Sequence, residues 1–258
     1  MKIFLLMIGL MAPAPGVSAE DWKLVWSDEF NYQGLPDKTK WDYEEGFVRN
    51  HESQYYTRER KENARVENGN LVIECRKEHF QPKGNQAVEY TSASLTSKLS
   101  WQYGRIEMRA KLPQGKGVWP AFWTMGTNRT QVGWPRCGEV DIMEFVGKDT
   151  NHIHGTAHYA VDGRHQSDGG KLETASPFDD FHLYAVEWYP DRIDFFFDKI
   201  KYHTVRLDQA GSGEENPFRK PHYLLVNFAM GGSWGGPFDD ATLPQQYLIN
   251  YIRVYQHK

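Results

Sequence analysis

The chain has 258 residues, a length that suits one large all-β domain or two small ones. Its formal net charge of −4 argues against a nucleic-acid-binding protein, because such proteins carry a basic excess. Two cysteines do not make a disulfide framework; Cys75 and Cys137 could pair, but we expect two buried thiols. Aromatic residues make up 14% of the chain, an excess that suits core packing or stacking on sugar rings.

Residues 1–19 have the pattern of a secretory signal peptide. Lys2 supplies the positive start, residues 3–11 form an apolar core, and Val17-Ser18-Ala19 is a small-residue cleavage site. The alternative is a retained membrane anchor, for which the apolar core is too short. We therefore predict cleavage after Ala19, a mature domain of residues 20–258, and a secreted or periplasmic protein without membrane contact.

Short segments of alternating apolar and polar residues follow, separated by glycine, proline, asparagine and aspartate. The predicted strands, in chain order, are Leu24–Phe30, Ala64–Glu67, Asn70–Glu74, Arg105–Leu112, Val118–Met125, Glu139–Val146, Ile153–Tyr159, His182–Tyr189, Ile193–Phe197, Tyr202–Leu207, Tyr223–Met230 and Tyr247–Gln256. Asn68-Gly69 is a strong hairpin signal between two of these strands. Helical periodicity is weak, and residues 37–41 and 177–181 are the best candidates for helical turns. This pattern predicts an all-β sandwich, with a jelly roll favoured.

One predicted strand carries three carboxylates among apolar residues. Glu139 and Asp141 share a face, because alternate side chains of a strand point the same way. Glu144 joins them only if a β-bulge absorbs one extra residue, and bulges are common beside active sites. The alternative is a half-solvated strand whose acids face water.

Two converging carboxyl groups can hydrolyse a glycosidic bond. One is the nucleophile, while the other protonates the leaving oxygen and later activates water. Retaining chemistry needs the two groups about 5–5.5 Å apart. On a bulged strand the Cα atoms of Glu139 and Glu144 lie roughly 13 Å apart, so the two side chains must lean toward one another. Asp141 between them would tune both neighbours.

Residues 138–145, Gly-Glu-Val-Asp-Ile-Met-Glu-Phe, resemble the active-site signature of glycoside hydrolase family 16, and the extra Met143 resembles its laminarinase-like branch. Further segments look like family blocks in family order: 26–30, 52–57, 90–97, 104–113, 119–123, 155–158, 184–194 and 251–256. The resemblance implies an all-β, concanavalin-like jelly-roll sandwich with a substrate groove on the concave sheet, filling residues 20–258. It also implies retaining endo-hydrolysis, with Glu139 as nucleophile, Asp141 as assisting acid and Glu144 as general acid/base.

Aromatic residues near the acids are candidate substrate contacts. Trp119 and Trp123 share a strand face and could stack on sugars or belong to the core. Trp234 lies in a glycine-rich loop, where it could form a groove wall or anchor the loop.

Polar candidates lie on both sides of the acids in the sequence. The resemblance implies that Asn50 and Glu52 contact sugars away from the cut, although Arg49 and His51 depart from the laminarinase pattern. His158 follows the acids and could hydrogen-bond the sugar or the general acid.

The sequence offers two candidate metal sites. His152, His154 and His158 would share a strand face, but no cysteine or acid completes a zinc-ligand spacing, so we disfavour zinc. Family 16 members often bind calcium on the outer face, and the matching positions are Glu29, the Gly69 carbonyl and Asn250. Asn250 stands where an aspartate is usual, so calcium affinity should fall. We expect at most a structural calcium and no cofactor for catalysis.

The leading hypothesis is a secreted endo-β-1,3-glucanase acting on laminarin-type glucan, and also on mixed-linkage β-1,3-1,4-glucan. One alternative is a hydrolase of marine galactans such as agarose or carrageenan, which the overall acidity mildly opposes. The other is a non-catalytic β-glucan-binding lectin, which has no use for three clustered acids. We expect a monomer whose partner is a β-glucan polysaccharide and that binds no nucleic acid.

Overall fold

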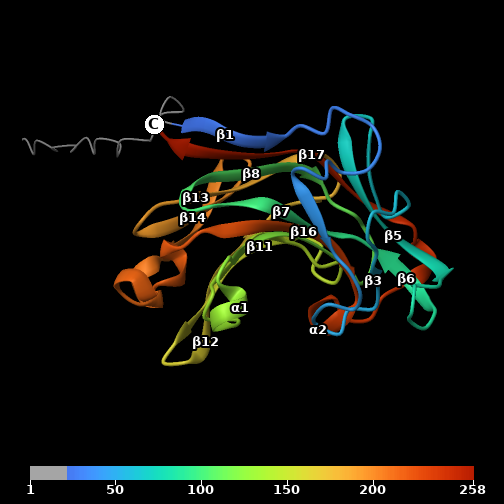
Figure 1. Ribbon diagram of the computed structural model, residues 1–258. Coiled ribbons are helices and arrows are strands. Elements are labelled where there is room, and N and C mark those ends of the chain that lie inside the picture. Colours follow the sequence, from blue (N-terminus) through green and yellow to red (C-terminus); the bar gives the residue numbers. More distant parts are fainter. Residues whose placement is uncertain (1–21) are drawn as a thin grey trace, which may run out of the picture.

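A computed structural model describes residues 22–258, so the predicted signal peptide and its cleavage site lie outside the described residues. Two antiparallel sheets pack face to face (Figure 1). The outer sheet contains β1 (Trp22–Asp28), β3 (Tyr55–Tyr56), β4 (Ala64–Glu67), β5 (Asn70–Phe80), β6 (Val88–Ser92), β8 (Gly104–Lys111), β13 (His182–Trp188), β14 (Arg192–Phe197), β15 (Ile200–Arg206) and β17 (Gln245–His257). Its order is β15-β14-β13-β8-β17-β5-β6-β3, with β1 beside β17, β4 beside β5, and β3 parallel to β6.

The inner sheet has seven strands. They are β2 (Trp41–Glu44), β7 (Ser94–Trp101), β9 (Val118–Gly126), β10 (Glu139–Glu144), β11 (His152–Val161), β12 (Arg164–Glu173) and β16 (His222–Met230). Their order is β12-β11-β10-β9-β16-β7-β2, which places the acid-bearing β10 between β9 and β11.

Within residues 22–258, helical structure is confined to short connecting turns. These are α1 (Arg129–Val132), α2 (Gly232–Gly235), and the 3₁₀ helices η2 (Leu207–Ala210), η3 (Gly213–Glu215), η4 (Pro217–Arg219) and η5 (Asp240–Thr242). No helix among residues 22–258 is long and apolar enough to span a membrane.

The core lies between the two sheets, as the alternation of β8 predicts. Ile106, Met108 and Ala110 are buried there, while Arg105 and Arg109 on the other face are partly exposed. In β9 all nine residues are buried, because one face packs on the core and side chains above the inner sheet cover the other. A strand buried on both faces can hold functional side chains rigidly in a dry environment.

The predicted all-β sandwich is confirmed, and every predicted strand is present, with exact ends for β4 and shifted ends for the others. The prediction missed β2, β3, β6, β7 and β12. The edge strand β12 shows why: it is almost wholly polar, contains two glycines, and lies mostly exposed, so it has no apolar alternation. Residues 37–41 and 177–181 form turns rather than helices, and Trp41 already begins β2. Cys75 and Cys137 are both free and buried, as predicted.

Candidate active site

A β-bulge in β10 brings the three acids to one face of the inner sheet. Asp141 pairs with Thr156 of β11 and Glu144 pairs with His154, so Ile142 and Met143 together oppose the single residue Gly155. The pairing with β9 shifts at the same place. Ile142 and Met143 both enter the core, which turns Glu144 back to the face that carries Glu139 and Asp141. The predicted bulge is therefore present.

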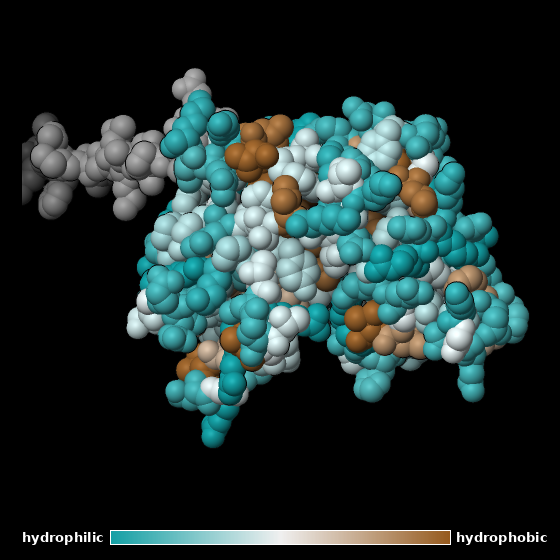
Figure 2. Space-filling view, in the orientation of Figure 1, coloured by the Kyte–Doolittle hydropathy of each residue, from teal (hydrophilic) through white to brown (hydrophobic). Residues whose placement is uncertain are grey.

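All three acids line one cavity of about 270 Å³ on the side of the inner sheet away from the core. Four other predicted contacts line it too: Asn50, Glu52, Trp119 and Trp123. Figure 2 shows that the molecule is hollowed along its lower edge, between the part with α1 and β12 and the part with α2. Asp141 is only 3% exposed, while Glu139 and Glu144 are partly exposed, so the acids face this cavity and not an open flat surface.

Burial raises the proton affinity of each acid. Desolvation, followed by the charge of Asp141, raises the pKa of Glu139 to about 8. Desolvation also raises the pKa of Asp141. The pKa of Glu144 is raised well above its usual range by desolvation and then by the Asp141 charge. At neutral pH the cluster therefore retains protons, as an acid catalyst requires.

Two tryptophan N–H groups orient the outer two acids. Trp119 Nε1 donates to Glu144 Oε1 at 2.9 Å, and Trp134 Nε1 donates to Glu139 Oε2 at 3.0 Å. Trp119 is only 8% exposed, whereas Trp134, on the loop after α1, is 46% exposed and lines the cavity. Sequence reasoning missed Trp134, because a loop residue has no periodicity; its place five residues before Glu139 was the only available signal.

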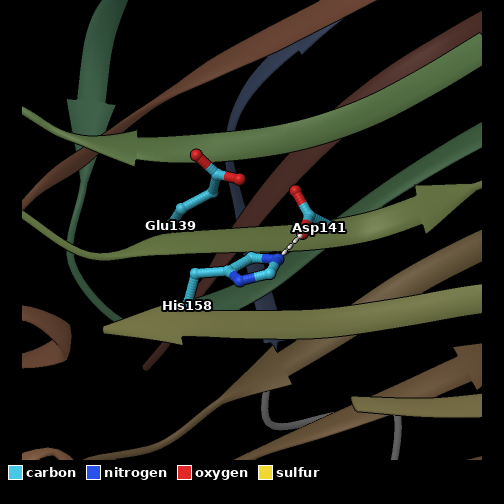
Figure 3. A group of neighbouring side chains, drawn as sticks. All are labelled: Glu139, Asp141 and His158. Carbon is cyan, nitrogen blue, oxygen red and sulfur yellow. Dashed lines mark ion pairs between the residues drawn. The ribbon is translucent and has the colours of Figure 1, made fainter. Parts of the chain in front are cut away.

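His158 does not line the cavity but contacts the central acid. Its Nε2 lies 3.0 Å from Asp141 Oδ2 (Figure 3), and β11 places it opposite Glu139. Asp141 Oδ2 has no aligned hydrogen-bond donor among the described residues. One ligand atom each from Glu139, Asp141 and His158 lies within 4.8 Å of the others, so this group has the donor set of a metal site, although two-carboxyl hydrolysis needs no metal.

A polar network fixes Glu52 at another part of the cavity. Its Oε2 accepts hydrogen bonds from Gln54 Nε2 at 2.9 Å and Tyr56 Oη at 2.8 Å, and Asn50 Nδ2 lies 3.3 Å from its Oε1. Asn227 extends this network, because Tyr56 Oη lies 3.0 Å from its Nδ2. Asn227, which sequence reasoning did not select, also lines the cavity.

The Trp123 side chain is buried, and a hydrogen bond and a cation–π contact fix its position. It is 5% exposed, its Nε1 donates to Asn227 Oδ1 at 2.8 Å, and the Arg49 guanidinium lies 5.0 Å from its ring centroid. Arg49 forms an ion pair with Glu44 and lines the cavity, while its Nη1 is buried without a hydrogen-bond partner. The departure from the laminarinase pattern at this position thus reaches the candidate site.

Trp234 supports the site from the side. Its ring packs edge-on against Trp119, 5.5 Å between centroids, and against His154 at 5.0 Å. His152 and His154 are near Asp149, at 2.6 and 3.5 Å, while His158 faces Asp141. The three histidines share a face, but two of them face Asp149 and the third faces Asp141, so they do not converge on one zinc site.

The proposed calcium ligands are occupied by internal contacts. Asn250 Nδ2 donates to the Gly69 carbonyl at 3.0 Å, and its Oδ1 accepts from Arg109 at 3.2 Å. Arg253 donates to both carboxylate oxygens of Glu29, at 2.9 and 2.8 Å. The Gly69 carbonyl thus accepts from the Asn250 amide, and the oxygens of Asn250 and Glu29 accept from arginines. With these oxygens occupied by hydrogen-bond donors, the three positions do not fit a calcium ion.

Comparisons with known proteins agree with this geometry. The sequence model for glycosyl hydrolases family 16 matches residues 51–253. A β-glucanase of Rhodothermus marinus is 43% identical over 252 residues, covering 92% of this chain and 86% of the relative. A glucan endo-1,3-β-glucosidase of Cryptopygus antarcticus is 38% identical, covering 91% and 92%. The X-ray structure of the laminarinase from Rhodothermus marinus superposes with a TM-score of 0.83 at 43% identity, covering 92% of this chain and 98% of that one.

An all-β jelly roll whose concave sheet carries paired carboxyl groups in a hollow defines a glycoside hydrolase. The chain belongs to glycosyl hydrolases family 16. The resemblance to the laminarinase-like branch is likewise confirmed.

Proposed function

We propose that this protein is a retaining endo-β-1,3-glucanase that hydrolyses laminarin-type glucan and also mixed-linkage β-1,3-1,4-glucan. The observation that carries the proposal is the bulge in β10, which brings Glu144 into the same cavity as Glu139 and Asp141 in a family 16 fold. The names of the relatives, a β-glucanase, a glucan endo-1,3-β-glucosidase and a laminarinase, support the β-1,3-glucan assignment.

In the first step Glu139 attacks the anomeric carbon, and Glu144 gives its proton to the leaving glycosidic oxygen. A carbon–oxygen bond to Glu139 forms as the glycosidic bond breaks. Glu144 suits the acid role, because burial raises its pKa well above the usual range and Trp119 fixes Oε1. The Trp134 N–H at Glu139 Oε2 supports the ionised form of the nucleophile.

In the second step water attacks the anomeric carbon of the glycosyl–enzyme intermediate. Glu144, now ionised, takes a proton from that water. Glu139 leaves as a carboxylate. Asp141 lies between the two glutamates and shares the proton that the cluster holds, so its charge changes as theirs do. Two displacements at one carbon retain the β-configuration.

The cations of the cavity support a neutral substrate. The lining contains two arginines, Arg49 and Arg129, and Arg49 is already paired with Glu44. A sulfated galactan would find few free cations there to bind its sulfate groups, whereas a neutral glucan needs none.

A polysaccharide panel tests the assignment: laminarin, mixed-linkage β-glucan, agarose and κ-carrageenan, read by released reducing ends and product size. We expect internal cleavage of laminarin first and of mixed-linkage glucan second. Proton NMR of the earliest product should show the β-anomer, and an α-anomer would refute retention. Binding of laminarin without product would favour the lectin, and cleavage of a galactan alone would favour the rival enzyme.

Secretion and oligomeric state complete the proposal. The N-terminal pattern supports export with cleavage after Ala19. We further propose that the enzyme is a monomer. N-terminal sequencing of the exported protein should begin at Glu20, and light scattering should give the mass of one chain.

A further inference from the structure

Three ionisable side chains on neighbouring strands connect the central acid to the surface. His158 Nε2 on β11 lies 3.0 Å from Asp141 Oδ2 on β10, as Figure 3 shows. His158 Nδ1, the other ring nitrogen, lies 2.9 Å from His165 Nε2 on β12. The two imidazole rings stack with centroids 5.1 Å apart, and His165 is exposed. Asp141, by contrast, is 3% exposed.

We propose that His165 is a positioning residue that fixes the tautomer of His158 and, together with His158, passes protons between Asp141 and solvent. The inference rests on the proposed function, in which the charge of Asp141 changes during each turnover. Asp141 is 3% exposed and lines the cavity that substrate would fill, so a path through β11 and β12 would give its proton a separate route to solvent.

The tautomers of the two rings are coupled to the charge of Asp141. When His158 is neutral and its Nδ1–H donates to His165 Nε2, His158 Nε2 carries a lone pair, and a hydrogen bond to Asp141 then requires the proton on Asp141. If His165 Nε2–H donates instead, His158 Nε2–H faces an ionised Asp141. The absence of an aligned donor on Asp141 Oδ2 fits the first state, because that oxygen can then carry the proton itself.

Conversion between the two states changes the tautomer of each ring but leaves its charge the same. Asp141 gives its proton to His158 Nε2, His158 gives its Nδ1 proton to His165 Nε2, and His165 releases its Nδ1 proton to water. The reverse sequence returns Asp141 to its neutral form. No oxidant, metal or further reactant is needed.

The groups around His158 and His165 favour proton transfer between Asp141 and solvent. Glu139, Asp141 and Glu144 on β10 are the acidic groups near His158. The Trp134 ring covers His165 at 4.7 Å between centroids, and the same indole donates to Glu139. His165 is therefore held against His158 on one side while its other side meets solvent.

Three substitutions separate the relay from a packing role. His165→Phe keeps a ring against Trp134 and His158 but has no nitrogen. His165→Gln keeps an acceptor for the His158 Nδ1–H but cannot pass a proton through. His165→Ala removes both. We expect kcat on laminarin to fall about tenfold or more in the Phe and Ala variants, with KM nearly unchanged, and to fall less in the Gln variant.

Three further kinetic measurements should change if His165 transfers protons but not if it only packs against its neighbours. The pH profile of kcat should shift in His165→Phe, its solvent isotope effect should rise, and added imidazole should restore activity to His165→Ala. His203→Gln is the matched control, since His203 pairs with Asp168 at 3.0 Å on the neighbouring strands. Wild-type kcat and pH profile in His165→Phe would overturn the proposal.

An activity-independent measurement keeps the proposal testable if the glucanase assignment fails. Nitrogen-15 NMR of the histidine rings should show His158 protonated mainly at Nδ1 in the wild type and a different tautomer mixture in His165→Phe. An unchanged His158 tautomer would overturn the inference even in an active enzyme. An inactive wild type with the expected tautomer change would instead reject the proposed function.

Discussion

Glutamates on the two sheets occupy opposite electrostatic environments. On the outer sheet, Arg60 Nη1 and Nη2 donate to the two carboxylate oxygens of Glu78, at 2.6 and 2.9 Å. These hydrogen bonds hold the pKa of the Glu78 carboxyl below its usual range. On the inner sheet, burial and the neighbouring Asp141 raise the pKa of Glu139 to about 8. Arg49 lines the same cavity but is held by Glu44. The glutamate anion is thus stabilised in one place and made less favourable, and hence more reactive, in the other.

The difference separates residues that stabilise the fold from residues that work against it. A paired, half-exposed carboxylate contributes modestly to stability. Three acids collected in a buried cavity cost stability, because each must be desolvated near the others. Such a cluster is retained where function requires it.

The largest expected effect is loss of activity from the inner-sheet acids. Glu139→Gln should lower kcat/KM on laminarin by about 10⁴-fold, because it removes the nucleophile while the amide keeps the shape. Glu78→Gln on the outer sheet is the matched control and should leave kcat within about twofold. Equal losses in both variants, measured as released reducing ends, would abolish the distinction between the two environments.

A smaller effect should follow from removing one oriented donor. Trp119→Phe keeps the ring but deletes the N–H on Glu144, so kcat should fall about tenfold. Since that hydrogen bond lowers the pKa of Glu144, the alkaline limb of the pH–rate profile should move to higher pH. Trp123→Phe, which loses a donor to Asn227 instead, should leave that limb in place. An unmoved limb in Trp119→Phe would contradict the assignment of Glu144 as the acid.

The pH dependence of stability should have opposite signs on the two sheets. Glu139 binds its proton more tightly in the folded than in the unfolded state, so its contribution to stability falls as pH rises from about 4.5 to about 8. Glu139→Gln should therefore raise Tm relative to wild type by about 2 °C or more at pH 8.5, and by less at pH 5.

Glu78 should show the reverse trend. Its pKa is lowered in the fold, so the stability that it contributes is present at neutral pH and is lost as pH falls through the acid range. Glu78→Gln should thus lower Tm at pH 7, with a difference that shrinks toward pH 3. Calorimetry over this pH range would reject the comparison if both variants gave parallel curves.

The smallest expected effect concerns calcium on the outer sheet. Arginines already neutralise Glu29 and hold Asn250, so millimolar calcium should change the wild-type Tm by less than about 1 °C. Asn250→Asp restores a carboxylate and should create a calcium-dependent rise. A rise in the wild type that a chelator reverses would show that calcium displaces these internal contacts.

The sequence predicted the sandwich and the acid cluster because both depend on local period. Alternation places Glu139 and Asp141 on one face, and the odd spacing of Glu144 requires a bulge, which the structure contains. Asn68-Gly69 likewise marked the hairpin between β4 and β5.

Other parts of the site depend on the tertiary arrangement and could not be predicted. Trp134 lies on a loop, and His165 lies on a polar edge strand without alternation, so neither has a periodic signal. The histidines of β11 do share a face as predicted, but their partners, Asp149 and Asp141, depend on loop and sheet geometry. The occupation of the calcium positions by arginine depends on side chains distant in sequence.

The doubled core position at Ile142 and Met143 also bears on how this strand can change length. Deleting Met143 would restore regular alternation, and the second glutamate would still face the cavity, because the bulge already leaves it two register positions from Asp141 on β11. The deletion would therefore shorten the strand without inverting the acid pair. In most strands a one-residue change in length moves every later side chain to the wrong side. At this position the chain can lose one residue and keep the same sheet.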